Sequence, residues 1–460
     1  MPKNNAVLLC LFALLPLFAE AAPAKKATPL PPVMFHGKPF FPVGCYDCWN
    51  NLTGNVEIDQ GFLEAGGNFG ILGDLTLKEH PQYRWHQPLM QRRAELLAKN
   101  PRARDVALMV GISGLMLMEL KPGAKYHTPT SGAELQRRYD TLVEELKALA
   151  RNPNVIGYTV DEPENFYWRW YNANFSAEWQ RSKEGGLVKE IQKQLGPFFD
   201  LVRKHHPNAL LMPILAWYGT YREARALYDV VIANEYPTGG RDCKPLKGPL
   251  FRVVHDARCA VSAAREAGGG RSAIYMPPMY DVFSWDSRIL TKEEERYVCF
   301  APITQGVMGI CGWRLNRCSA DYRKNVIYPI MKEISSLSPF FLGEWHDEKV
   351  SSTRDESTHS YLQIFPERVR MVEGMEDNSL VAIKTPVPDV AHCLRKNGKG
   401  EYLLLAVNNT YETVDVTFLI RLDNLPATAM ERIAGKSVPI RKGGISDTLK
   451  PFDVKAYVFK

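Results

Sequence analysis

Residues 152–164 read Asn-Pro-Asn-Val-Ile-Gly-Tyr-Thr-Val-Asp-Glu-Pro-Glu. The run from Val155 to Val160 is short, apolar and without polar alternation, which is typical of a strand buried on both faces of a parallel sheet. It ends on two adjacent carboxylates, Asp161 and Glu162. Buried carboxylates are costly unless they react, pair or stay solvated, and mutual repulsion raises the pKa of one member of such a pair. The stretch therefore predicts a buried strand that delivers a general acid, Glu162.

Seven further runs of the same kind lie on either side of this one. They are Phe40–Cys45, Asn68–Leu72, Val106–Ile112, Ala209–Leu215, Val230–Ala233, Ala273–Met276 and Val307–Gly312. Amphipathic stretches separate them, and the clearest places Leu135, Tyr139, Leu142, Leu146 and Leu149 on one helical face. Eight buried strands alternating with helices predict an α/β fold, a (β/α)₈ TIM barrel over residues 39–343. No Gly-rich phosphate loop follows the first strand, which disfavours a doubly wound sheet.

The pattern changes after Trp345. Short alternating runs with turn residues between them replace the helices: Ser360–Phe365, Leu380–Lys384, Tyr402–Asn408, Thr413–Ile420 and Val454–Phe459. This pattern predicts an antiparallel β-sandwich over residues 344–460. Packing against the barrel as a structural accessory is its expected role.

The first 38 residues have a different composition. Lys3 precedes an apolar run from Ala6 to Phe18, and a small-x-small sequence follows at Ala19–Ala21. This arrangement predicts a signal peptide over residues 1–21, followed by a linker over residues 22–38 rich in Ala, Pro and Lys. We therefore expect a secreted or periplasmic protein with no membrane segment after cleavage.

Charge and cysteine spacing argue against several other functions. The 460 residues carry a formal charge of +6, with basic side chains scattered among acidic ones, so we expect no nucleic-acid partner. Cys45 and Cys48 form a CxxC without a second half-site, so we expect no metal and no other cofactor. Because strands one and eight of a closed barrel are neighbours, Cys48 and Cys318 are candidates for a disulfide. The oligomeric state is open.

The catalytic residues of TIM barrels lie at the carboxyl ends of the strands. The carboxylates there, beside Asp161 and Glu162, are Asp281 and Glu235 as candidate catalytic groups. Indole rings at a cleft suit the apolar faces of sugars, and polar groups hold their hydroxyls. The residues predicted to bind substrate in this way are Asp47, Trp49, Asp74, Trp168, Trp217, Tyr236, Tyr280, Trp285, Trp313 and Arg314. The combination indicates a carbohydrate substrate.

The stretch around Glu162 resembles the fourth-strand motif of clan A glycoside hydrolases, including the family 42 β-galactosidases. Those enzymes place an acid/base Glu, followed by Pro, after a strand reading Asn-Val-Ile-Gly-Tyr. Residues 36–44, 229–237 and 305–313 are similar to their first, sixth and eighth strands, and Trp313 then corresponds to the floor of the sugar subsite. The resemblance implies glycosidase activity with Glu162 as the acid.

Two departures change what the resemblance implies. Clan A enzymes have Asn before the acid, where this chain has Asp161, and a nucleophilic Glu on strand seven, where this chain reads Pro-Pro-Met-Tyr-Asp over 277–281. The Asp-Glu pair also resembles the family 20 and family 123 hexosaminidases. In those enzymes the Asp orients the substrate's own acetamido nucleophile, and a Tyr, here Tyr236 or Tyr280, donates to it.

Three mechanisms with Glu162 as acid remain open. A retaining enzyme would use Asp281 or Glu235 as nucleophile, an inverting one would use a more distant carboxylate around a water, and a substrate-assisted one would use Asp161. A different class of function is also open: a non-catalytic carbohydrate-binding protein on a decayed barrel, which the missing strand-seven Glu favours.

Overall fold

The computed structural model describes residues 28–46, 56–75, 101–112, 118–119, 128–163, 186–215, 221, 224–234, 250–281, 289–313, 315, 318–363 and 383–460. The bounds and contacts below refer to these residues.

Parallel strands from the first three quarters of the chain form one nine-stranded sheet in the order β10-β11-β12-β13-β3-β4-β5-β8-β9. In chain order these strands are β3 (Val43–Tyr46), β4 (Phe69–Leu75), β5 (Ala107–Ile112), β8 (Val155–Val160), β9 (Leu210–Leu211), β10 (Ile214–Leu215), β11 (Val230–Ala233), β12 (Ser272–Tyr275) and β13 (Ile310–Gly312). Each matches one of the predicted buried runs. The two strands at the ends of the order, β9 and β10, both come from the predicted fifth run.

The split of the fifth strand closes the sheet into a barrel. β9 pairs with β8, whereas β10 pairs with β11. Pro213 separates the two pieces, and because it has no N–H it cannot donate to a ladder. The Pro213 carbonyl still accepts from Ile232 N at 3.0 Å, and Asp161 forms a parallel bridge with Ile214. The prediction of an eight-stranded α/β barrel is therefore confirmed.

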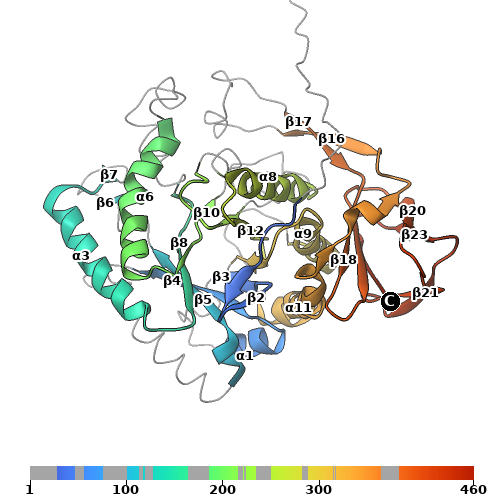
Figure 1. Ribbon diagram of the computed structural model, residues 1–460, viewed down its shortest axis with the longest axis horizontal. Coiled ribbons are helices and arrows are strands. Elements are labelled where there is room, and N and C mark those ends of the chain that lie inside the picture. Colours follow the sequence, from blue (N-terminus) through green and yellow to red (C-terminus); the bar gives the residue numbers. More distant parts are fainter. Residues whose placement is uncertain are drawn as a thin grey trace, which may run out of the picture.

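Helices pack around the barrel (Figure 1). They are α1 (Val56–Glu64), α3 (Gly132–Leu149), α6 (Gly186–His205), α8 (Arg252–Ala267), α9 (Lys292–Thr304), α10 (Ala320–Tyr322) and α11 (Tyr328–Phe341). Thr291 and Glu294 form a capping box at the start of α9, as Thr-x-x-Glu sequences do. The amphipathic spacing of residues 220–228 predicts a further helix, but residues 224–227 form turns and a bend. No helix among the described residues is long and apolar enough to cross a bilayer.

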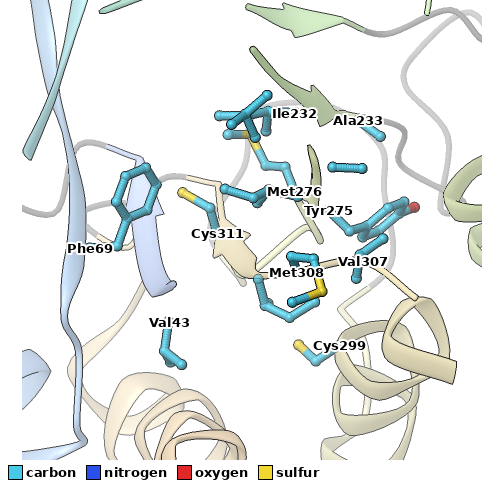
Figure 2. Packing of buried hydrophobic residues seen from close by; sticks show 14 of the residues in the cluster. Val43, Phe69, Ile232, Ala233, Tyr275, Met276, Cys299, Val307, Met308 and Cys311 are labelled. Carbon is cyan, nitrogen blue, oxygen red and sulfur yellow. The ribbon is translucent and has the colours of Figure 1, made fainter. Parts of the chain in front are cut away.

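Side chains from distant strands meet between the barrel and its helices (Figure 2). Val43 of β3 and Phe69 of β4 belong to the same buried cluster as Tyr275 of β12 and Cys311 of β13. Cys299 of α9 lies beside Val307 and Met308 in this cluster. The continuous apolar strands are therefore buried on both faces, as their sequence predicts.

Antiparallel strands follow the barrel. They are β14 (Glu344–Trp345), β15 (Val350–Ser352), β16 (Thr358–Gln363), β17 (Ile383–Pro388), β18 (Val390–Lys396), β19 (Tyr402–Asn408), β20 (Val414–Ile420), β21 (Thr428–Glu431), β22 (Lys436–Pro439), β23 (Gly444–Leu449) and β24 (Val454–Phe459). A six-stranded sheet, β14-β18-β19-β24-β21-β22, packs against the three-stranded sheet β15-β20-β23. The predicted C-terminal sandwich is confirmed.

The six-stranded sheet is buried on both faces. Adjacent residues of β19 belong to different cores: Leu404 packs within the sandwich, and Leu405 packs in the core of the barrel. β18, β19 and β24 lie against α9, with Tyr297 of α9 packed edge-on against Phe452 at 5.0 Å. The Tyr297 hydroxyl donates to Asn409 Oδ1 at 2.7 Å. The sandwich thus supplies one wall of the barrel's core (Figure 1).

Part of the predicted linker is ordered and structural, which corrects the assignment of residues 22–38. β1 (Val33–Phe35) and β2 (Lys38–Phe40) form a hairpin whose two turn residues, His36 and Gly37, both have positive φ. Such values define a type I′ turn, which matches the twist of a hairpin. Leu30 and Val33 are buried in the barrel core.

Helix α9 also buries a carboxylic acid, Glu295, whose side chain is inaccessible to solvent. The Tyr322 hydroxyl donates to its Oε2 at 3.1 Å. Burial raises the pKa of Glu295 from 4.5 to about 8, because the charged form loses its hydration. At neutral pH this residue is therefore a neutral hydrogen-bonded group in the core.

The raised pKa predicts that stability falls with rising pH. Between pH 4.5 and about 8 the folded chain keeps a proton that the unfolded chain releases, so the free energy of unfolding decreases through this window and levels above it. Glu295→Gln is neutral throughout, so its melting temperature should fall by roughly 5 °C less than that of the wild type between pH 5 and pH 8. Glu293→Gln, on the exposed side of the same turn, should follow the wild type. If the melting temperatures of the wild type and Glu295→Gln changed with pH in parallel, the prediction would be contradicted.

Candidate active site

The carboxyl ends of the parallel strands carry the predicted site. Asp161, Glu162, Tyr280, Asp281 and Trp313 lie within the described residues, and Asp74 is described only as backbone, within β4. Eight predicted site residues lie outside the described ranges: Asp47, Trp49, Trp168, Trp217, Glu235, Tyr236, Trp285 and Arg314.

Glu162 is half-buried, two residues beyond β8, in a left-handed backbone conformation with φ 37°. For a residue with a β-carbon this conformation is strained by typically about 1–3 kcal/mol of free energy, and such residues concentrate at functional sites. Its N–H donates to Ile214 O at 2.9 Å, next to the isolated bridge between Asp161 and Ile214 that follows the end of β8. The barrel therefore holds Glu162 in place through its backbone.

Asn234 is a side-chain partner of Glu162. It follows β11, is only 2% exposed, and donates from Nδ2 to Glu162 Oε1 at 2.5 Å. Asn234 is not among the residues that the sequence predicts for the site, whereas its neighbour Glu235 is. The available signal was position: Asn234 stands at the carboxyl end of a buried strand, at the same rim as Glu162.

Tyr280 and Trp313 form an aromatic wall at strands seven and eight. Their rings meet edge to face, with centroids 5.4 Å apart and planes at 74°. The Trp313 N–H donates to Pro277 O at 3.0 Å, which ties the two strand ends together. The structure brings these two predicted residues together, although only 8% of Tyr280 and 7% of Trp313 are exposed.

Asp281 interacts with the loop after strand eight. Its Oδ1 accepts the Ser319 N–H at 2.7 Å, and its Oδ2 accepts the Ser319 hydroxyl. Ser319 is itself the N-cap of α10, and its hydroxyl accepts from Tyr322 N at 3.2 Å. Both oxygens of Asp281 therefore hold the start of a helix, a common structural role of Asp.

The predicted Cys48–Cys318 disulfide is wrong. Cys318 is a buried free thiol that donates to Met279 O at 2.8 Å, whereas Cys48 lies outside the described residues. Cys318 follows β13, the neighbour of β3 in the sheet, but its side chain points toward strand seven. Burial also raises the pKa of the Cys45 thiol. The described residues contain no group of side chains suited to a metal ion.

Comparisons with known proteins bear on the fold. No family model and no curated protein matches the sequence. Many solved structures are similar, and three of them are similar over most of their own length and of this chain. A candidate α-galactosidase/melibiase of Bacteroides fragilis matches with a TM-score of 0.53 at 11% identity, over 92% of this chain and 79% of that one.

The other two are from Geobacillus. An α-amylase of Geobacillus thermoleovorans, complexed with acarbose, matches with a TM-score of 0.52 at 13% identity, over 92% of this chain and 99% of that one. A family 27 β-L-arabinopyranosidase of Geobacillus stearothermophilus, in complex with arabinose, matches with a TM-score of 0.50 at 10% identity, over 95% and 98%. The likeness to glycoside hydrolase barrels is confirmed at the level of the fold.

Proposed function

We propose that this protein is a secreted glycoside hydrolase that cleaves O-glycosidic bonds in an oligo- or polysaccharide, with Glu162 as general acid/base. The observation that supports this most is the placement of Glu162, a half-buried carboxyl at the end of strand four in a left-handed conformation beside a buried amide donor. The fold adds support, since the three similar barrels are named for sugar-cleaving enzymes. The signal peptide that the sequence predicts over residues 1–21 supports secretion.

In this proposal Glu162 performs both proton transfers. It first donates its proton to the glycosidic oxygen while a nucleophile bonds to the anomeric carbon, so that the bond from that carbon to the glycosidic oxygen breaks and the leaving alcohol departs neutral. The resulting carboxylate then takes a proton from the water that attacks the anomeric carbon and displaces the nucleophile from it. Proton transfer of this kind contributes about 10² to 10⁴ to the rate. The aromatic wall of Tyr280 and Trp313 would line the adjoining sugar subsite.

Of the two candidate partners Asp161 and Asp281, the contacts of Asp281 argue against it and the position of Asp161 beside Glu162 favours Asp161. A nucleophile or base must present one carboxylate oxygen to the anomeric carbon or to a water, and both oxygens of Asp281 accept hydrogen bonds from Ser319. Asp161 is half-buried directly beside Glu162. Its resemblance to the hexosaminidase pair then makes N-acetylhexosaminides the first substrates to screen, with the acetamido oxygen as nucleophile.

This choice predicts different losses for two isosteric variants. Asp161→Asn should reduce kcat by about 100-fold, because the amide cannot carry the negative charge that orients the reacting group. Asp281→Asn keeps one acceptor for Ser319, so it should reduce kcat less than about 10-fold and lower the free energy of unfolding by about 0.5–2 kcal/mol. Steady-state kinetics and chemical denaturation of both variants test this. The opposite order of losses in kcat would return Asp281 to the catalytic role.

Carbohydrate binding without catalysis remains the second candidate. The observation that favours it is that strand seven offers only Asp281, held by Ser319, where clan A barrels carry a Glu. A glycan array followed by product analysis separates the two. Binding of a glycan whose bonds stay intact under prolonged incubation would support the binding protein.

A further inference from the structure

Strand five, here β10, lies between Glu162 and Asn234 and forms a backbone hydrogen bond with each of them. Ile214 O accepts the Glu162 N–H at 2.9 Å, and the next carbonyl, Leu215 O, accepts the Asn234 N–H at 2.8 Å. Both backbones are thus tied to adjacent residues of β10. The two residues are 72 positions apart in the sequence, yet Asn234 Nδ2 lies 2.5 Å from Glu162 Oε1.

The hydrogen bonding of the Asn234 amide is unusual for a buried side chain. Its Oδ1 is buried and has no hydrogen-bond partner among the described residues, whereas its Nδ2 donates to Glu162. Leaving a buried acceptor without a hydrogen bond destabilises the folded state, and each such group in a native protein requires a specific explanation. Asn68 provides the contrast, because both ends of its amide bind backbone: Oδ1 accepts from Val43 N at 2.7 Å and Nδ2 donates to Phe41 O at 3.0 Å.

We infer that Asn234 is a positioning residue that fixes which oxygen of Glu162 carries the transferable proton. This inference rests on the proposed role of Glu162 as general acid. An N–H group can only donate, so Oε1 must accept, and the proton of the neutral acid then sits on Oε2. The same donor stabilises the carboxylate that forms when the proton leaves. Asn234 therefore sets both the direction and the pH range of the proton transfer.

The inference can be tested without a substrate. Glutamate labelled with ¹³C at Cδ is incorporated, and the resonance missing from Glu162→Gln identifies Glu162. In Asn234→Ala the ionised carboxylate loses its donor, so the titration midpoint of Glu162 should rise by about one pH unit. In Asn234→Asp, which is isosteric, two adjacent carboxyls share a proton, and the titration should split into two steps.

Asn68→Ala is the control, since it removes a half-buried amide whose side-chain hydrogen bonds with Val43 and Phe41 are both to backbone atoms. It should lower stability and leave the Glu162 midpoint unchanged. A midpoint in Asn234→Ala within 0.2 pH units of the wild type, or a single unshifted step in Asn234→Asp if the alanine variant does not fold, would overturn the inference.

On an aryl glycoside that the wild type cleaves, the high-pH limb of kcat/KM should move upward by the same amount in Asn234→Ala, because the acid then keeps its proton to higher pH. The two proposals fail separately. Full activity of Glu162→Gln would refute the proposed acid whatever the titration shows. An inactive Glu162→Gln together with an unshifted Asn234→Ala titration would refute only the role of Asn234.

Discussion

Replacement of Glu162 by Gln is expected to lower kcat/KM by about 10³-fold while the protein folds normally. The carboxamide has the same shape, and its oxygen can still accept the N–H of Asn234, but it has no proton to give to a leaving oxygen. The backbone contacts to strand five are unaffected, so the melting temperature should stay within about 2 °C of the wild type. Initial rates on the best substrate from a screen of aryl glycosides, N-acetylhexosaminides included, measure the effect.

The dependence on the leaving group separates an acid from a residue that merely binds sugar. A good leaving group needs little protonation, so the loss in Glu162→Gln should shrink markedly from a phenyl to a dinitrophenyl glycoside. A sugar-binding role predicts the same loss for both substrates. Glu64→Gln is the control for the substitution itself, because Glu64 is exposed and ends α1, which leads into the amino end of β4. Turnover near that of the wild type in Glu162→Gln would show that another residue is the acid.

The barrel could be predicted from its sequence because each strand is a continuous apolar run. Val155–Val160 and Val230–Ala233 match β8 and β11 residue for residue. The sandwich was harder to predict in detail, since β21 and β22 each bury only one or two side chains in four residues. β18 is buried on both faces although it contains His392 and Arg395, so it lacks the alternation that marks a strand. Burial of those polar groups depends on partners that sequence spacing does not reveal.

The candidate site shows the same division. Glu162 was recognisable because a buried strand runs into two acids, a local pattern. Asn234 was not, because an amide at a strand end is common and its role arises only from its position across β10. The predicted disulfide of Cys318 was wrong for a related reason: strand order predicts which segments are neighbours, but not the direction in which a side chain points.

A chain that ends at Gly343, without the sandwich, is expected not to fold into a stable barrel. The sandwich is not a separate body in this structure, because its six-stranded sheet covers α9 and contributes Leu403, Leu405 and Val407 to the core of the barrel. Tyr297 is fully buried, and its partners Phe452 and Asn409 both belong to the sandwich. An aromatic side chain of this kind buries about 150–250 Å². Its exposure, together with the rest of the covered face, leaves a large apolar patch, which favours aggregation.

Two neighbouring residues of β19 test the same idea in the full chain. Leu404 and Leu405 are both fully buried, but Leu404 faces the sandwich core and Leu405 the barrel core. Each Leu→Ala change should cost about 2–5 kcal/mol, and because one sheet serves both cores, each should lower a single calorimetric transition of the whole protein. Two transitions, of which Leu404→Ala moves only one, would show independent domains. Together with a truncated chain that melts cooperatively, that result would make the sandwich the accessory that its sequence suggests, whereas one transition makes it part of the scaffold that holds Glu162.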